Sequence, residues 1–190
     1  MANAVDNVRK ILAELELILN YIDEKQTEHL VDKILATKEV GKKVYIAGVG
    51  RSSLMIRSFA MRLMHLDIPV YVVGETVTPA IQEGDLLIIG SGSGETSTLT
   101  ILAKKAKKEG VQISLITRNP SSTLGSLADC ILNIPIEKGK SGFQPSGSTF
   151  EQCMLLICDA MVIRMMEKSG LLSLGVSIDD IIKRKHANLE

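Results

Sequence analysis

Apolar residues near the start of the chain recur at steps of three and four positions, which predicts an amphipathic helix. They are Val5, Val8, Ile11, Leu12, Leu15, Ile18, Leu19 and Ile22. A second, shorter stripe contains Leu30, Val31, Ile34 and Leu35. We expect two N-terminal helices within residues 3–38, with their apolar stripes buried against a sheet or a partner chain.

Beyond these helices, short apolar runs alternate with stretches of helical period. The runs cover residues 44–47, 70–73, 85–90, 111–117 and 130–134. Runs that are apolar throughout are typical of parallel strands covered on both faces. The alternation predicts an α/β fold with a doubly wound, flavodoxin-like parallel sheet of five strands. We expect one domain over residues 1–190, ending in a helical tail over 171–190.

One strand–helix junction carries six small or polar residues in a row, Ser91-Gly92-Ser93-Gly94-Glu95-Thr96. Glycines let a ligand approach the backbone, and the first amides of a helix are unpaired and favour anions. The hydroxyls of Ser91, Ser93 and Thr96 are further donors, so we interpret the segment as a phosphate cradle. A plain N-cap and turn is the alternative. Glu95 stands where a Walker A loop needs lysine, which argues against nucleoside triphosphates.

The junction after the first strand reads Gly48-Val49-Gly50-Arg51-Ser52-Ser53. Gly48 and Gly50 resemble the start of a dinucleotide fingerprint, but Ser53 stands where its third Gly or Ala should be, so we expect helix and strand to pack less closely than in that motif. We therefore favour a second ligand-facing turn, in which Arg51 donates to the ligand; a solvated loop cation is the alternative.

Three further positions have two open interpretations each. Glu75 follows the second strand and either faces the ligand crevice or lies in a surface turn. Glu151 begins a helix and matches a capping box with Ser148, so its catalytic interpretation depends on the Gly-rich connection over 137–148. His186 is inert in a frayed tail, but could reach a site if it docks on a neighbouring chain. His65 ends a helix, where a cationic side chain suits the dipole.

Composition narrows the function. Lys plus Arg and Asp plus Glu both number 22, and aromatic residues make up 3%, so nucleic acid is not the expected partner. The cysteines Cys130, Cys153 and Cys158 lie in apolar runs, which favours buried thiols in a reducing cytoplasm. The chain begins without the pattern of a signal peptide, and no apolar run is long enough to span a membrane. The histidines, at positions 29, 65 and 186, have no metal-ligand spacing.

Together these motifs resemble 6-phospho-3-hexuloisomerases, a group within the sugar isomerase (SIS) domain family. The segments that carry the resemblance are Gly48–Ser52, Gly74–Pro79, Ser91–Thr96, Pro145–Glu151 and His186–Leu189. The serine-rich segment is typical of the whole SIS family. The loop at Gly74, the Phe150-Glu151 pair and the terminal motif point to the hexuloisomerase group within it.

The resemblance implies interconversion of D-arabino-hex-3-ulose 6-phosphate and D-fructose 6-phosphate without metal or nucleotide. It implies a homotetramer that works with 3-hexulose-6-phosphate synthase in the ribulose monophosphate pathway and formaldehyde fixation. It also implies phosphate binding by Ser52, Ser91, Ser93 and Thr96, a catalytic base at Glu151, and a catalytic role for His186. From their places in the loops, Gly50, Arg51 and Glu75 are further candidates for substrate binding. Two rival functions stay open, an aldose–ketose phosphate isomerase and a non-catalytic sugar-phosphate sensor.

Overall fold

The computed structural model describes residues 3–136, 142–174, 177–186 and 188. The strands are β1 (Val44–Gly48), β2 (Val70–Val72), β3 (Leu86–Gly90), β4 (Gln112–Thr117) and β5 (Cys130–Asn133). The α-helices are α1 (Ala4–Leu19), α2 (Glu24–Glu39), α3 (Gly50–His65), α4 (Ser97–Lys108), α5 (Thr123–Leu127), α6 (Ser148–Lys168) and α7 (Ile178–Lys183). A 3-10 turn, η1 (Leu171–Leu174), follows α6. Parts of the predicted 137–148 connection and of the 171–190 tail lie outside the described residues.

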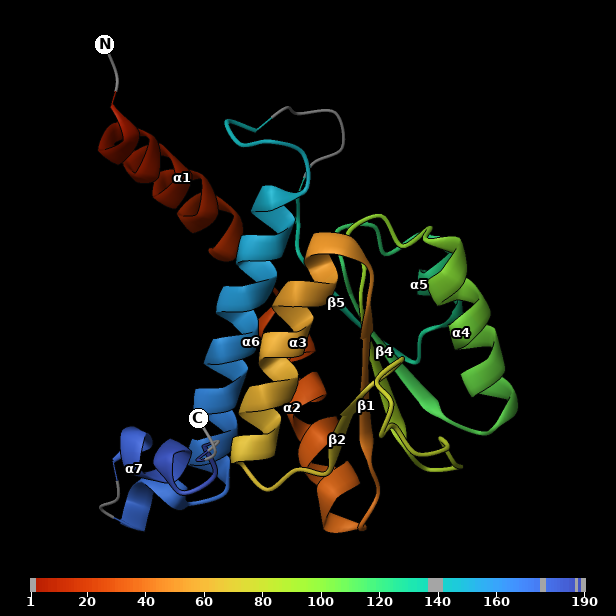
Figure 1. The fold of residues 1–190 in the computed structure, drawn as a ribbon. Helices are drawn as coiled ribbons and strands as arrows, with labels where there is room; N and C mark the ends of the chain where they lie inside the picture. The colour runs from red at the N-terminus through yellow and green to blue at the C-terminus, as the bar shows by residue number, and fades with distance from the viewer. Residues whose placement is uncertain (1–2, 137–141, 175–176, 187, 189–190) are drawn as a thin grey trace.

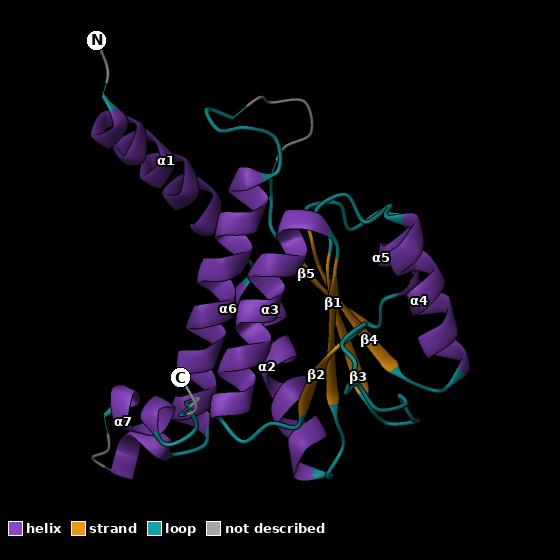
Figure 2. Ribbon diagram, in the orientation of Figure 1, coloured by secondary structure: helices purple, strands orange, loops and turns teal. Residues whose placement is uncertain are grey.

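The strands form one parallel sheet in the order β2-β1-β3-β4-β5, which confirms the predicted doubly wound fold. Strand side chains alternate between two apolar clusters. Val44 and Ile46 pack with residues of α2, α3 and α6, whereas Tyr45 and Ala47 pack with residues of α4 and α5. Figures 1 and 2 show these two helical layers on opposite faces of the sheet.

The chain leaves the centre of the sheet in opposite directions after β1 and β3. From β1 it crosses through α3 to β2, whereas from β3 it crosses through α4, on the other face, to β4. Where neighbouring strands send their helices to opposite faces, a crevice opens beyond the strand ends, and ligands of such sheets bind there. The two loops predicted to bind the ligand both begin at this point.

The packing of α3 on β1 differs from the prediction. Ser53 was expected to hold helix and strand apart, but an added Cβ on Gly48 would lie 2.9 Å from the Cα of Ser53. Helix α3 therefore packs closely on β1, because Gly48 on the strand has no side chain and leaves room for the backbone of Ser53.

Helix α1 extends away from the body of the molecule and reaches it near the start of α6 (Figure 1). Leu15 is its buried residue. The helix also exposes Val5, Val8, Leu12 and Leu17. These four side chains thus have little cover from the part of the chain that the structure describes. Among the described residues, no helix is both long and apolar enough to cross a membrane.

Candidate active site

A cavity of about 180 Å³ opens beyond the carboxyl ends of β1 and β3. Hydroxyl groups supply much of its lining, from Ser52, Ser91, Ser93, Thr96 and Ser146. Four of these residues were predicted to bind phosphate, and the fold brings Ser52, in the first turn of α3, together with the three from the Ser91–Thr96 segment. The sheet therefore forms the expected pocket at the switch point between β1 and β3.

Three long helices begin at this cavity, and none of them is capped by a side chain. Their N-cap residues are Val49 for α3, Thr96 for α4 and Gly147 for α6, and all three line the cavity. Val49 and Gly147 have no polar side chain, and the Thr96 hydroxyl does not bond to its own helix. Because the first amides of a helix need acceptors, three sets of amides and three helix dipoles favour an anion here.

The Ser91–Thr96 segment is held with its carbonyl groups turned toward β4 and α5. The carbonyl oxygen of Gly92 accepts a hydrogen bond from Thr117 Oγ1 at 3.3 Å, and that of Ser93 accepts one from Asn119 Nδ2 at 3.0 Å. The carbonyl oxygen of Gly94 accepts one from the amide of Leu124 at 3.0 Å. These bonds keep carbonyl oxygens, which would repel phosphate, on the side of the loop that faces the protein.

Each serine hydroxyl of the loop accepts one hydrogen bond from a loop amide, and its own O–H group remains available as a donor. Ser91 Oγ accepts from the amide of Gly94, and Ser93 Oγ accepts from that of Glu95, both at 3.2 Å. An oxygen that accepts a hydrogen bond keeps its own O–H for another acceptor. Both hydroxyls can therefore donate to a ligand oxygen without leaving a loop amide unpaired.

The loop glycines have a different role from the predicted one. An added Cβ on Gly94, whose φ is +68°, would lie 1.9 Å from Ser122 Oγ. One on Gly92 would lie 3.0 Å from the ring of Phe150. The space beside both residues is filled by protein atoms, so these glycines allow close packing of the loop rather than approach of a ligand.

Glu151 lies in the first turn of α6 and is 7% exposed. The alternative of a capping box between Ser148 and Glu151 is wrong, because Gly147 is the N-cap and the helix receives no side-chain cap. Instead, Glu151 Oε2 accepts a hydrogen bond from Arg51 Nε at 2.6 Å. Its other oxygen, Oε1, lies 3.4 Å from the point where a Cβ on Gly147 would stand, next to the cavity wall. The ion pair fixes the carboxylate beside the pocket.

Arg51 is therefore engaged with a carboxylate rather than free for a phosphate. Its neighbour Gly50 begins α3 with φ +61°, a left-handed conformation that glycine adopts without strain. Glu75 forms an ion pair with Arg57 on α3. Both partners are about half exposed, and neither lines the cavity. The structure thus places Glu75 at the predicted edge of the sheet but outside the pocket.

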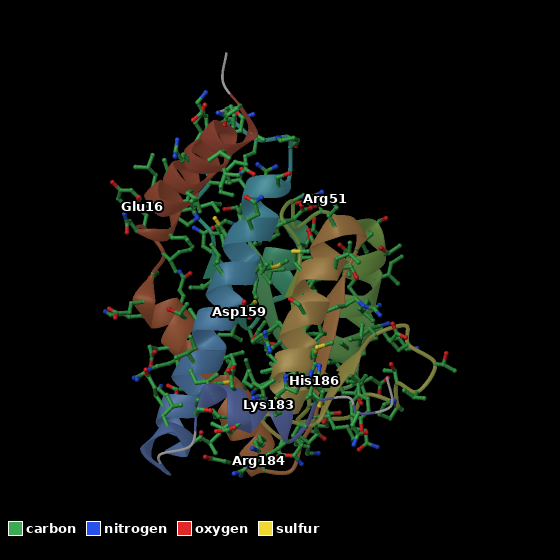
Figure 3. All side chains as sticks on the ribbon, turned by 60° about the vertical axis from the view of Figure 1, so that its left-hand side comes forward. Glu16, Arg51, Asp159, Lys183, Arg184 and His186 are labelled. Atoms are coloured by element: carbon green, nitrogen blue, oxygen red, sulfur yellow. The ribbon has the colours of Figure 1, made fainter. Side chains whose placement is uncertain are left out.

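His186 lies far from Glu151 within one chain. Its ring packs on His65 with 5.6 Å between ring centroids. His65 and Arg51 are 14 positions apart on α3, roughly 21 Å along the axis. Figure 3 shows Arg51 and His186 toward opposite ends of this helix. Residues 187 and 189 of the predicted tail motif lie outside the described residues.

His65 itself differs from its prediction as a cationic side chain at the end of α3. Its ring is 2% exposed, and neither nitrogen has a hydrogen-bond partner among the described residues. Burial, followed by the positive charge of Arg62, lowers the pKa of His65 below its ordinary value of 6.5. The residue is consequently neutral near pH 7 and belongs to the core.

Sequence reasoning missed Arg118, which lines the cavity directly after β4. Its position was a usable signal, because residues that follow the strands of a parallel sheet lie at the ligand edge. Arg118 also lines a second, larger cavity of about 640 Å³ between α1 and the start of α6. There, Thr149 Oγ1 donates to Glu14 Oε1 at 2.9 Å.

The fold and the site define an α/β protein with a hydroxyl-lined pocket, suited to an anion, at the switch point of its sheet and a carboxylate held beside it. The SIS domain model matches residues 39–164, and the chain belongs to this family.

Named relatives are similar over most of the chain. The 3-hexulose-6-phosphate isomerase of Bacillus subtilis (strain 168) is 43% identical, over 96% of this chain and 97% of its own length. That of Mycobacterium gastri is 42% identical, over 78% and 74%. A solved hypothetical protein of Methanococcus jannaschii, with an inferred molecular function of 3-hexulose-6-phosphate isomerase, superposes with a TM-score of 0.82. It is 34% identical over 97% of this chain and 99% of its own.

Proposed function

We propose that the protein interconverts D-arabino-hex-3-ulose 6-phosphate and D-fructose 6-phosphate. The observation that carries the proposal is the buried Glu151 carboxylate, held by Arg51 beside a pocket onto which three uncapped helices open. The pocket suits the phosphate and the carboxylate suits the reacting carbons. The names of relatives that match nearly the whole chain support the same substrate pair.

The reaction moves a carbonyl group between carbons 2 and 3. Glu151 removes the proton from carbon 3 of fructose 6-phosphate, and the electron pair forms a 2,3-enediolate. The same carboxylic acid returns a proton to carbon 2, while a proton passes from oxygen 3 to oxygen 2, which leaves the ketone at carbon 3. A positioned base of this kind contributes about 10²–10⁴-fold to the rate. Glu151 Oε1 is the oxygen for this step, because Arg51 holds Oε2.

Phosphate binding places the reacting carbons at the base. The hydroxyls of Ser52, Ser91, Ser93 and Thr96 donate to the phosphate oxygens, together with the free amides of the helices. Binding energy gained there is used to orient carbons 2 and 3. The N–H groups of Arg51 that do not bind Glu151 can stabilise the enediolate oxygen.

The active form is a homotetramer in which His186 acts on the site of a neighbouring subunit. The exposed apolar residues of α1 support assembly, and the distance between His186 and Glu151 in one chain favours a role between subunits. The enzyme works in the cytoplasm, in sequence with 3-hexulose-6-phosphate synthase. Its three free, buried cysteines are consistent with a reducing compartment.

Complementation tests the role of His186. Glu151→Gln and His186→Gln subunits, each expected to be impaired, are unfolded, mixed and refolded together. Hybrid oligomers should regain activity, because a site with wild-type Glu151 can then receive wild-type His186 from its neighbour. Refolded single variants are the control. Activity no higher than the sum of these controls would contradict a shared site, and light scattering would report the mass against four times 20.6 kDa.

Hydrogen exchange tests the reaction itself. Fructose 6-phosphate is incubated with the protein in heavy water and followed by NMR. Deuterium at carbon 3 is the expected result, because the 2,3-enediolate is reprotonated there from solvent. Deuterium at carbon 1 would indicate an aldose–ketose isomerase instead. Binding without exchange would indicate a sugar-phosphate sensor, and Glu151→Gln is the control that should bind without exchange.

A further inference from the structure

Of the described residues that line the phosphate cavity, Arg118 alone has a charged side chain. The other donors in the lining are hydroxyls and backbone amides, which are neutral. A sugar phosphate near pH 7 carries close to two negative charges, and a charged donor forms shorter and stronger hydrogen bonds to such a group. Arg118 is therefore placed to supply the positive charge that the rest of the lining lacks.

The backbone on both sides of Arg118 is fixed to the serine-rich loop. Thr117 Oγ1 donates to the carbonyl oxygen of Gly92 at 3.3 Å, and Asn119 Nδ2 donates to that of Ser93 at 3.0 Å. The amide of Asn119 donates to Thr117 Oγ1 at 3.1 Å. The main chain at Arg118 thus keeps a constant position relative to the phosphate donors.

The Arg118 side chain, by contrast, is exposed and has no hydrogen bond or ion pair with any described residue. Other arginines at this edge of the sheet differ. Arg51 donates to Glu151, and Arg57 pairs with Glu75. Arg118 thus has a fixed backbone and lines the cavity, and no described residue binds its guanidinium, so this group is available for a ligand.

We propose that Arg118 binds the phosphate group of the substrate and thereby selects phosphorylated ketoses over free ones. The planar guanidinium fits phosphate with two parallel hydrogen bonds. This inference rests on the proposed function for the identity of the sugar, but not for the phosphate. Arg118 contacts the end of the substrate that does not react, so its loss affects binding more than the chemical step.

Steady-state kinetics with fructose 6-phosphate provide the first test. Arg118→Gln should raise KM about 10-fold to 100-fold and leave kcat nearly unchanged, since hydrogen bonds to charged groups are each worth ~1.5–3 kcal/mol. KM of the variant should also become less sensitive to salt, because a charge pair is lost. Arg118→Lys keeps the positive charge but cannot form two parallel hydrogen bonds to the phosphate. Its KM should therefore lie between those of wild type and Arg118→Gln. Lys105→Gln, on the exposed face of α4, removes one charge outside the cavity and should match wild type.

Orthophosphate binding, measured by calorimetry, is the second test and needs no turnover. Arg118→Gln should weaken it by the same factor as KM, with an unchanged circular dichroism spectrum. Equal orthophosphate affinity in wild type, Arg118→Gln and Arg118→Lys would overturn the inference. A wild-type protein that binds orthophosphate through Arg118 yet exchanges no hydrogen would remove the proposed reaction and leave this inference standing.

Discussion

The helices of this protein begin in two different ways, depending on where they start. Four helices whose N-cap residues do not line the pocket, α1, α2, α5 and α7, each have an N-cap side chain that accepts a hydrogen bond from the helix: Asn3, Asp23, Ser122 and Ser177. At the pocket, α3, α4 and α6 have none. A cap typically contributes ~1 kcal/mol, so three caps are missing where an anion can replace them. We infer that α3, α4 and α6 forgo the stability of an N-cap and leave their first amides open to a ligand in the pocket.

The largest expected effect comes from the start of α6. Glu151→Gln should lower kcat by at least about 100-fold, because the amide cannot accept the substrate proton. The free energy of unfolding should change little, since Glu151 does not cap the helix. Turnover and denaturant unfolding are measured on the same preparation. Full turnover with a loss of stability would instead restore the capping interpretation.

A matched pair of substitutions compares the two kinds of helix start. Ser93→Ala should raise KM about tenfold, because a donor to the charged phosphate is lost, with kcat less affected. Asp23→Ala, at the capped start of α2, should lower the free energy of unfolding by ~1 kcal/mol and leave KM unchanged. A raised KM in Asp23→Ala would contradict the division of roles.

Adding a cap at the pocket tests the comparison in the opposite direction. Val49 is half exposed and has an extended backbone at the N-cap of α3, so Val49→Asp can cap that helix. We expect a gain of about 0.5–1 kcal/mol in stability and a severalfold rise in KM, because the new carboxylate competes with phosphate for the amides. Val49→Asn caps without charge and should raise KM less. An unchanged KM in Val49→Asp would show that phosphate does not use these amides.

The smallest expected effect lies at the far end of α3. The pKa of His65 is lowered in the folded state, chiefly by burial, so the unfolded chain binds more protons as pH falls through 6.5. Stability due to the neutral ring is therefore present above pH 6.5 and declines below it, until the pH reaches the lowered pKa. Thermal unfolding from pH 7.5 to 5 should be less pH-dependent in His65→Leu than in wild type. Equal slopes would contradict this account.

The strands, their parallel direction and the serine-rich segment at the pocket were all predicted from the sequence, because these features depend on local patterns. Apolar runs predicted β1 to β5, and Ser91–Thr96 combined hydroxyls with a helix start. Prediction from the sequence failed where partners come from distant parts of the chain. It left Glu151 open between a cap and a catalytic base and did not find its partner Arg51, 100 positions away. It also expected a cation at His65, which instead enters the core.

The sequence by itself determined the alternation of strands and helices, and with it the edge of the sheet where a ligand binds, because periodicity and strand direction are local properties. Only the tertiary structure decided which side chains act there. It turned the loop carbonyls toward Thr117 and Asn119, paired Arg51 with Glu151, and placed Arg118 beside the hydroxyls with no ion-pair partner among the described residues. The physical reason is that hydrogen bonds and ion pairs form between groups that meet in space, and sequence spacing does not specify those meetings.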